Sequence, residues 1–405
     1  MILHARVVVT MDGPPIENGG VAIKGNRIVD LGRLGDVKAR SSDQVIDLGD
    51  VALLPGLINA HCHLDYTSLR SRISAPGSFT DWIRLINAQK AKLSEQDYIT
   101  SITEGLAEAA RFGTTSIANL TAFPQLIATI QTALRLWWFA EVIDVRGQDS
   151  AANIIHAALG ALAAARSRSG GVGLAPHAPY TASQSVFRLA QEESFKTPLR
   201  LTTHLAESRE EMEMFRDAKG PLYDFLKEMG RDMSDCGGLT PLRYFFNTIS
   251  SIEGWIIAHL NELADSDFDF LEKSKGRFSV VHSPRSHNYF GHSTFPFPEL
   301  RSLGFNICLG TDSLASNDDL SLFAEMRAFQ EGEPGISPEE ILSMVTVNPA
   351  LALGEARSLG KLRAGYRADM VAVPFRGSRK NLFEAILGFD NSVIFSMIAG
   401  KVVTG

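Results

Sequence analysis

Cysteine is scarce in this chain of 405 residues, which contains only Cys62, Cys236 and Cys308. These three residues are far apart and form no Cys-x-x-Cys pair, so the sequence indicates reduced thiols, as in a cytoplasm, and no disulfide framework. No run of eighteen or more apolar residues occurs, so we expect no membrane-spanning helix. The first ten residues lack the charged and continuously apolar regions of a secretory signal peptide. We therefore expect a cytoplasmic protein with no membrane partner.

The chain has no excess of positive charge, since it contains 39 Lys and Arg residues and 46 Asp and Glu residues, which gives a net charge of −7. Nucleic-acid-binding proteins usually carry a basic surface, so we expect a small-molecule substrate and no nucleic-acid partner. The chain is 45% hydrophobic and 21% charged, which is typical of a folded globular protein with a large core. The oligomeric state is left open, and a homo-oligomer is compatible with the composition.

Both ends of the chain have the composition of short β-strands. The N-terminal end reads as strands separated by turns at Asn18-Gly19-Gly20 and Gly25-Asn26. The C-terminal end contains similar strand-like runs at Asp369–Val373 and Ser392–Ala399. Neither end alone has enough strands for independent stability. We therefore predict that residues 1–54 and 359–405 together form one small, discontinuous β-sandwich domain.

The region between them, residues 55–358, alternates short apolar runs with helical stretches. The eight apolar runs are Leu53–Ala60, Thr114–Leu120, Leu136–Val142, Val172–Pro176, Leu199–Thr203, Trp255–Ala258, Phe278–Val281 and Phe305–Leu309. Strands that are apolar throughout are typical of a covered parallel sheet. Eight such units predict an α/β fold with an eight-stranded β/α barrel of the TIM type. An open, doubly wound sheet is the alternative, but no Gly-x-Gly-x-x-Gly motif follows the first strand.

Histidines gather at the ends of these predicted strands. Six of the ten lie at or just past a carboxyl end, namely His61, His63, His177, His204, His259 and His282. A β/α barrel builds its active site on this face. His61 and His63 are two residues apart on an extended segment, so their imidazoles point to the same side and form half of a zinc or iron site.

Other polar residues at these strand ends can complete such a site. His204 and Asp312 are available as further ligands, although a lone histidine is often a hydrogen-bonded core residue. Asp312 can equally be a turn or an N-cap residue, because a helix is expected to start near Asn317. Glu207, three residues after His204, can transfer a proton beside a metal, or else lie in the first turn of the next helix. His259 can orient a water molecule, or simply pack in the core.

Four segments match a known family. They are Leu54–His63 (LPGLINAHCH), His177–Thr181 (HAPYT), Thr203–Ser208 (THLAES) and Leu309–Asn317 (LGTDSLASN). Together they resemble the adenosine/guanine deaminase–chlorohydrolase branch of the amidohydrolase superfamily, and the likeness covers nearly the whole chain. The resemblance implies one divalent metal ion, zinc before iron or manganese, with the ligands His61, His63, His204 and Asp312.

The same resemblance assigns roles around the metal. Glu207 matches the acid/base glutamate, His259 matches the histidine that helps to hold the water, and Asp312 steadies the developing charge. Branches with two metals use a carboxylated lysine near strand four, where this chain reads His177-Ala178-Pro179. The missing lysine supports a single metal.

The segment after strand seven, His282–His292 (HSPRSHNYFGH), departs from the Pro-x-Ser-Asn pattern of many relatives. It is similar to the aminodeoxyfutalosine deaminase-like group, which acts in menaquinone biosynthesis. This likeness gives Arg285 a substrate carboxylate as partner and places Tyr289 in an aromatic pocket, with a structural ion pair and loop packing as the alternatives. Trp82 resembles the aromatic residue that these deaminases place over the substrate, and His177 is expected to contact the ring.

The resemblance implies hydrolytic deamination of an aminopurine nucleoside, with 6-aminodeoxyfutalosine as one candidate. Metal-bound hydroxide would attack the ring carbon and ammonia would leave. Deamination of S-adenosylhomocysteine, methylthioadenosine or guanine is an alternative, as is removal of chloride or an alkylamine from a triazine. A metal-retaining binding or scaffold protein is a third possibility. Glu207 and His259 argue against it, because binding alone needs no proton shuttle.

Overall fold

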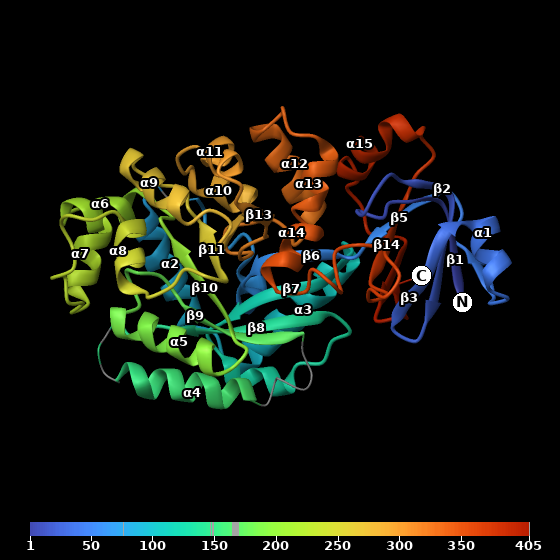
Figure 1. The fold of residues 1–405 in the computed structure, drawn as a ribbon. Coiled ribbons are helices and arrows are strands. Elements are labelled where there is room, and N and C mark those ends of the chain that lie inside the picture. The colour runs from blue at the N-terminus through green and yellow to red at the C-terminus, as the bar shows by residue number, and fades with distance from the viewer. Residues whose placement is uncertain (76, 146, 148–149, 164–169, 405) are drawn as a thin grey trace.

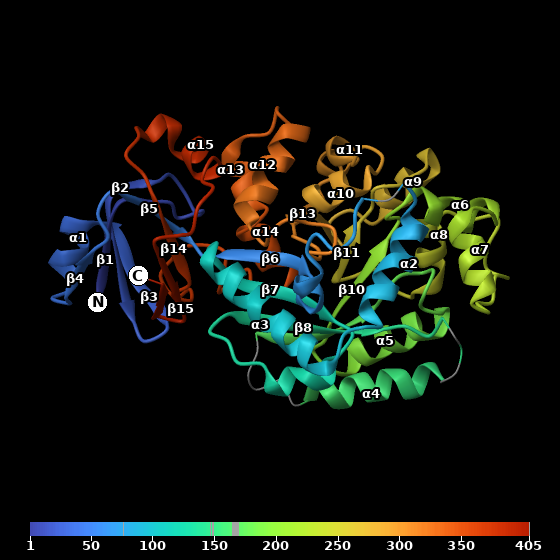
Figure 2. The same cartoon turned by 180° about the vertical axis from the view of Figure 1, so that it is seen from behind.

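The computed structural model describes residues 1–75, 77–145, 147, 150–163 and 170–404. It contains a large α/β body and, beside it, a small β-domain in which both chain termini lie (Figures 1 and 2). The predicted fold class, a β/α barrel with a small domain formed by both termini, is confirmed. Among the described residues, no helix is long and apolar enough to cross a membrane.

The small domain is one sheet built from both ends of the chain. Its strands are β1 (Ile2–Val8), β2 (Ile16–Lys24), β3 (Arg27–Arg33), β4 (Val45–Asp47), β5 (Val51–Pro55), β14 (Met370–Pro374), β15 (Phe395–Ile398) and β16 (Lys401–Thr404). Their order is β16-β15-β14-β5-β1-β2-β3, and β4 pairs with β1. β5 and β14 pair antiparallel, with Met370 opposite Pro55. This pairing joins the two halves of the domain.

The predicted turn at Asn18–Gly20 is wrong, because these residues lie inside β2. A Cβ atom on Gly19 would lie 2.4 Å from Cγ2 of Val8, so the neighbouring side chain leaves no room for a larger residue. Glycine within a strand often marks such a close approach. Here glycine indicates tight packing, and not a change of direction.

The barrel consists of eight parallel strands that pair in chain order. They are β6 (Leu57–Cys62), β7 (Thr114–Thr121), β8 (Arg135–Val142), β9 (Gly171–Pro176), β10 (Arg200–Leu205), β11 (Trp255–His259), β12 (Ser279–His282) and β13 (Asn306–Leu309). Each predicted apolar run corresponds to one of these strands, except that Leu53–Ala60 is shared between β5 and β6. At Gly56, between these two strands, a Cβ atom would lie 2.2 Å from Oγ1 of Thr115. Because β5 ends at Pro55 and β6 begins at Leu57, the small domain leads directly into the first barrel strand.

The barrel closes at a seam between β6 and β13. At the carboxyl end of the seam, the backbone N–H groups of Thr311 and Asp312 both donate to the carbonyl of His61, each at 3.1 Å. Lower down, the chain between α13 (Pro338–Ser343) and α14 (Val347–Ala352) bridges the gap. Its carbonyls accept one hydrogen bond from each strand: Ile58 N–H to Val345 O at 2.8 Å, and Leu309 N–H to Met344 O at 2.9 Å.

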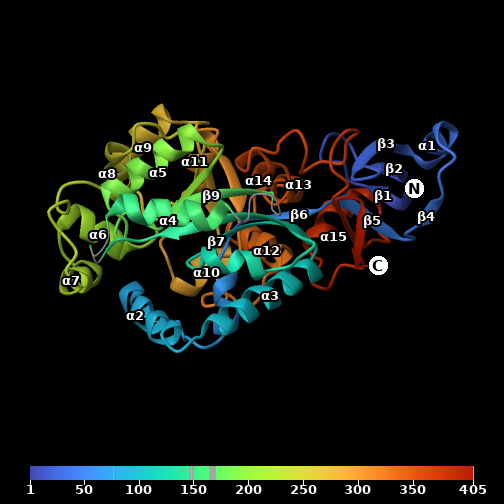
Figure 3. The ribbon, with the colours of Figure 1, turned by 90° about the horizontal axis from the view of Figure 1, so that it is seen from below.

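Helices surround the barrel and cover its rim (Figures 1 and 3). Besides α13 and α14 they are α2 (Phe79–Lys90), α3 (Glu95–Arg111), α4 (Ala151–Ala163), α5 (Gln184–Lys196), α6 (Arg209–Asp217), α7 (Pro221–Glu228), α8 (Pro241–Thr248), α9 (Asp265–Lys273), α10 (Pro284–Phe290), α11 (Phe297–Ser302) and α12 (Leu322–Gly332). Helix α1 (Leu34–Arg40) packs against β2 and β3 of the small domain, whereas α15 (Leu382–Leu387) packs against α12 and α13. The helix expected near Asn317 begins only at Leu322, with Ser321 as its N-cap. Asp312 is therefore not a helix cap.

Candidate metal centre and active site

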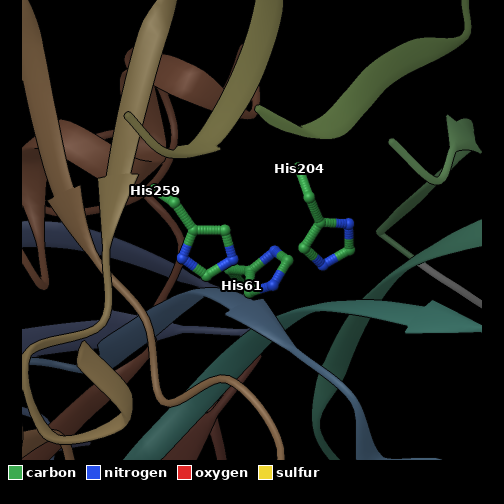
Figure 4. A group of neighbouring side chains, drawn as sticks. All are labelled: His61, His204 and His259. Carbon is green, nitrogen blue, oxygen red and sulfur yellow. The ribbon is translucent and has the colours of Figure 1, made fainter. Parts of the chain in front are cut away.

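Histidine and aspartate side chains converge at the carboxyl end of the barrel strands. Among the described residues, two overlapping groups have the spacing of a metal site, with ligand atoms within 4.8 Å of one another. The groups are His61, His204, His259 and His61, His63, Asp312. Figure 4 shows the imidazoles of the first group gathered in one place, each from a different strand. The four predicted ligands thus lie together on one face of the barrel.

The distances within this cluster are short. The Nε2 atoms of His63 and His204 are 3.1 Å apart. Oδ1 of Asp312 lies 3.8 Å from Nε2 of His61 and 3.8 Å from Nε2 of His63. All four side chains are buried. Three imidazoles and one carboxylate form a donor set that suits a single ion of zinc or a similar metal.

Unpaired buried atoms support the fit to a metal. Neither ring nitrogen of His61 has a hydrogen-bond partner in the described part of the chain. A buried polar atom without a partner costs about 1–3 kcal/mol, which a metal ion bound there would offset. Burial also lowers the pKa of His61 to about 3 and the pKa of His63 well below its ordinary value. The imidazoles are therefore neutral, which is the form that binds metals.

Hydrogen bonds orient two of the four side chains. Nδ1 of His204 donates to the carbonyl of His177 at 2.8 Å, which leaves Nε2 free to face the cluster. The hydroxyl of Ser286 donates to Oδ2 of Asp312 at 2.7 Å, and the other carboxylate oxygen faces His61 and His63. These contacts hold both groups in the orientation that a metal ligand needs.

Backbone strain marks the same face of the barrel. Ala206, His259 and Asp312 have φ values of 51°, 78° and 55°, in the left-handed region that non-glycine residues rarely adopt. Each follows or ends a barrel strand: β10, β11 and β13. Such strain costs on the order of 1–3 kcal/mol per residue and typically clusters at functional sites.

Glu207 lies beside this cluster and outside the following helix. Helix α6 begins at Arg209 with Ser208 as its N-cap, so Glu207 is not in the first helical turn. Its Oε1 is 3.7 Å from Nε2 of His259. Burial, and then the negative charge of Asp312, raise the pKa of Glu207 well above its ordinary value. A buried carboxyl group with a raised pKa can take and return a proton near neutral pH.

A cavity of about 630 Å³ opens onto the cluster and is within the usual size range of small-molecule sites. Its floor includes His63, His204, Glu207 and Asp312. An apolar wall comes from α2 and α7 and includes Phe79, Trp82, Ile83, Leu222, Phe225 and Leu226. Both Trp82 and His177, which we predicted to bind substrate, line this cavity.

Arg285 and Tyr289, in contrast, are not among the residues that line the cavity. The guanidinium of Arg285 donates to Asp319 at 2.7 Å and to Asp318 at 3.0 Å. The hydroxyl of Tyr289 donates to the carbonyl of Ile73 at 3.0 Å. The structure therefore favours the alternatives for these two residues, an ion pair and loop packing, over substrate binding.

Two residues that the sequence analysis did not single out contact the candidate ligands. One is Ser286, the neighbour of Asp312. The other is Glu141, whose Oε1 lies 3.5 Å from Nδ1 of His63. Glu141 is the only charged residue in the apolar run Leu136–Val142, and a lone charge in a buried strand is a signal that could have identified it.

The fold and this cluster define the class of the protein, an α/β barrel with a candidate metal site at the carboxyl ends of its strands. The chain belongs to the amidohydrolase family, whose model matches residues 52–403. The predicted membership is confirmed, and with it the expectation of a hydrolase that acts on carbon–nitrogen bonds.

Similar proteins are known in sequence and in structure. The chain is 29% identical over 389 residues to a 5-methylthioadenosine/S-adenosylhomocysteine deaminase of Desulfitobacterium hafniense, covering 92% of this chain and 85% of the relative. It superposes on Helicobacter pylori aminofutalosine deaminase in complex with methylthio-coformycin with a TM-score of 0.85, at 21% identity and 99% coverage of both chains. For an adenosine deaminase of Xanthomonas campestris with bound zinc, the TM-score is 0.83 at 22% identity, covering 100% of this chain and 92% of the other. At these identities the two solved structures show the shared fold.

Proposed function

We propose that this protein is a zinc-dependent deaminase that hydrolyses the exocyclic amino group of an adenine nucleoside with a 5′ substituent. The observation that carries the proposal is the position of Glu207, a buried carboxyl group with a raised pKa, beside three histidines and Asp312 at the floor of a largely apolar cavity. The names of the sequence relatives, which are deaminases of such nucleosides, support it.

His61, His63, His204 and Asp312 would hold the metal, and three imidazoles with one carboxylate favour zinc. Bound there, the ion would lower the pKa of a water molecule, which makes water a nucleophile at neutral pH. Glu207 takes a proton from the attacking water and delivers it to the ring nitrogen, so that the adjacent carbon becomes electrophilic. His259, 3.7 Å from Glu207, helps to orient the water. Water adds to the ring carbon, and Glu207 then passes the remaining hydroxyl proton to the amino group. The carbon–nitrogen bond breaks, a ring carbonyl forms, and the amino group leaves as ammonia.

The walls of the cavity suit a flat, mostly apolar ligand. Trp82 on α2 and Phe225 on α7 offer aromatic faces for a purine ring or an apolar 5′ group such as a methylthio group. The ring of His177 lies 4.7 Å from that of His204, centroid to centroid, where it can contact the base beside the metal. These contacts favour methylthioadenosine-like substrates.

A second candidate is 6-aminodeoxyfutalosine, which would place the protein in menaquinone biosynthesis. Its carboxylate needs a cation, and Arg285 is already bound to two aspartates. Lys90, however, lines the cavity from the end of α2 and offers an ammonium group there. This residue keeps the second candidate open.

The test is an ammonia-release screen of the zinc-loaded protein. The panel contains 5′-methylthioadenosine, S-adenosylhomocysteine, 5′-deoxyadenosine, adenosine, 6-aminodeoxyfutalosine, guanine and a chlorotriazine. We expect the highest kcat/KM for an adenine nucleoside with an apolar 5′ group. Higher kcat/KM for 6-aminodeoxyfutalosine would select the second candidate. Release of chloride from the triazine without deamination, or no turnover of any compound by zinc-loaded protein, would refute the proposal.

A further inference from the structure

Glu141 stands out among the acidic residues of the cavity because it lies beside the candidate ligand His63, on the side of the imidazole that is turned away from the cluster. It is next to the last residue of β8, and its side chain is only 4% exposed. Its Oε1 lies 3.5 Å from Nδ1 of His63. That nitrogen is itself buried and has no hydrogen-bond partner within the described residues. A small change in the angle of either side chain would give a full hydrogen bond.

The two nitrogens of His63 have different surroundings. Nε2 lies 3.1 Å from Nε2 of His204 and 3.8 Å from Oδ1 of Asp312, so it faces the cluster. Nδ1 is on the other side of the ring and faces Glu141. His204 is arranged in the same way, except that its Nδ1 donates to the backbone carbonyl of His177. Each of these two imidazoles thus has an acceptor next to its Nδ1 atom. For His204 the acceptor is a backbone carbonyl, and for His63 it is the carboxylate of Glu141.

We propose that Glu141 is a positioning residue of the metal centre, which accepts a hydrogen bond from Nδ1–H of His63. This bond fixes the proton of the imidazole on Nδ1 and leaves the Nε2 lone pair for the metal. The carboxylate also increases the electron density of the ring and strengthens the bond to a cation. The inference rests on the proposed metal centre. It does not depend on the identity of the substrate.

Glu141 has a competing role, because it also lines the cavity. Its carboxylate could accept hydrogen bonds from substrate hydroxyl groups. The two roles differ in what they change, since a positioning residue alters the affinity for the metal when no substrate is present. A substrate-binding residue alters only KM.

The experiment measures zinc affinity by competition with a chromophoric chelator, starting from metal-free protein. The variants are Glu141→Gln, which keeps the size and an acceptor oxygen but removes the charge, and Glu141→Ala, which removes the acceptor. Loss of such an outer partner typically weakens metal binding by about 10–100-fold. We expect a loss in that range for Glu141→Ala and a smaller loss, about tenfold, for Glu141→Gln. The control is Glu192→Gln, which makes the same exchange at an exposed residue on α5 outside the cavity and is expected to bind zinc like the wild type.

Two further measurements make the result decisive. Thermal unfolding of the metal-free proteins separates weak zinc binding from a folding defect. If Glu141→Ala does not fold, Glu141→Gln alone decides. Wild-type zinc affinity in Glu141→Gln, with or without a higher KM, overturns the proposal. If the wild type binds zinc but releases no ammonia, the proposed function fails. The zinc dissociation constants of the variants still test the positioning role of Glu141 in that case.

Discussion

The Nε2 atoms of His63 and His204 lie 3.1 Å apart, although the two residues come from opposite sides of the barrel. His63 directly follows β6 and His204 belongs to β10, four strands further along the order of an eight-stranded sheet. The two imidazoles therefore meet across the mouth of the barrel. Both rings are buried and uncharged, so their facing lone pairs repel each other unless a proton or a cation lies between them.

We expect removal of the metal to lower the stability of the whole barrel for this reason. A ligand that binds only the folded state stabilises it by about 2.7 kcal/mol when present at one hundred times its Kd. Thermal unfolding with a chelator should give a lower Tm than with added zinc. The His204→Ala variant should show no zinc-dependent rise. His156→Ala, an exposed residue on α4, serves as the control and should keep the rise. Equal Tm values for wild-type protein with chelator and with zinc would contradict the metal site.

Replacement of Glu207 should separate metal binding from turnover. Glu207→Gln keeps the shape of the side chain but cannot take up a proton, so kcat should fall by about 10²–10⁴. Zinc content, measured by atomic absorption, should stay at the wild-type level. Glu228→Gln on α7, where the side chain is 74% exposed, is the matched control and should leave kcat unchanged. A Glu207→Gln protein with normal turnover would exclude the proton-transfer role.

Arg285 offers a test of a structural role against a substrate-binding role. Arg285→Ala removes the bonds to Asp318 and Asp319 and leaves the buried carboxylate of Glu325 without its nearby cation. We expect the free energy of unfolding to fall by about 1–3 kcal/mol, because the packing of the largely buried Arg285 side chain and its charged hydrogen bonds are lost. KM should not change. A selective rise in KM for carboxylate-bearing nucleosides would instead return Arg285 to the substrate site. Arg277→Ala, which breaks an exposed pair with Glu253, should change stability by less than about 1 kcal/mol.

Glu210 connects the wall of the cavity to α6, the helix that follows the strand of His204. From α6, its carboxylate accepts hydrogen bonds from the backbone N–H groups of Phe79 at 3.0 Å and Thr80 at 2.9 Å, at the start of α2. Glu210→Ala should release this end of α2 and with it Trp82. We expect KM to rise about 5- to 30-fold, which corresponds to about 1–2 kcal/mol, with a much smaller change in kcat. Steady-state kinetics beside Glu192→Gln, an exposed residue on α5, provide the comparison. Unchanged KM would mean that α2 needs no such anchor.

The barrel could be predicted from the sequence because its strands are buried on both faces, so that apolar residues make up the larger part of most of them. The metal cluster could be predicted because the carboxyl ends of such strands meet at one face, so that His61, His204 and Asp312 all lie at the same end of the barrel. These inferences depend on local patterns that the fold then brings together.

Other features depend on contacts that no local pattern reveals. Ser337 caps α13, yet this helix ends at Ser343 and helical structure resumes only with α14 at Val347, because Met344 and Val345 enter the seam. The partners of Arg285 lie more than thirty positions away, at Asp318 and Asp319, and only the folded chain brings them within reach. The glycines within β2 are wrongly predicted as a turn, because the sequence alone does not show that the side chain of Val8 packs against Gly19.

The seam between β6 and β13 also sets the order in which the protein can mature during synthesis. The strand with His61 leaves the ribosome early, but its hydrogen-bond partners at the seam, Asp312 and the α13–α14 segment, are synthesised much later. The barrel can close only after both have been made. The preceding strand β5 can pair with β1 early, but its second partner, β14, comes near the C-terminus. We therefore expect nascent chains that stop short of the α13–α14 segment to lack a metal centre, even when all four ligands have been translated.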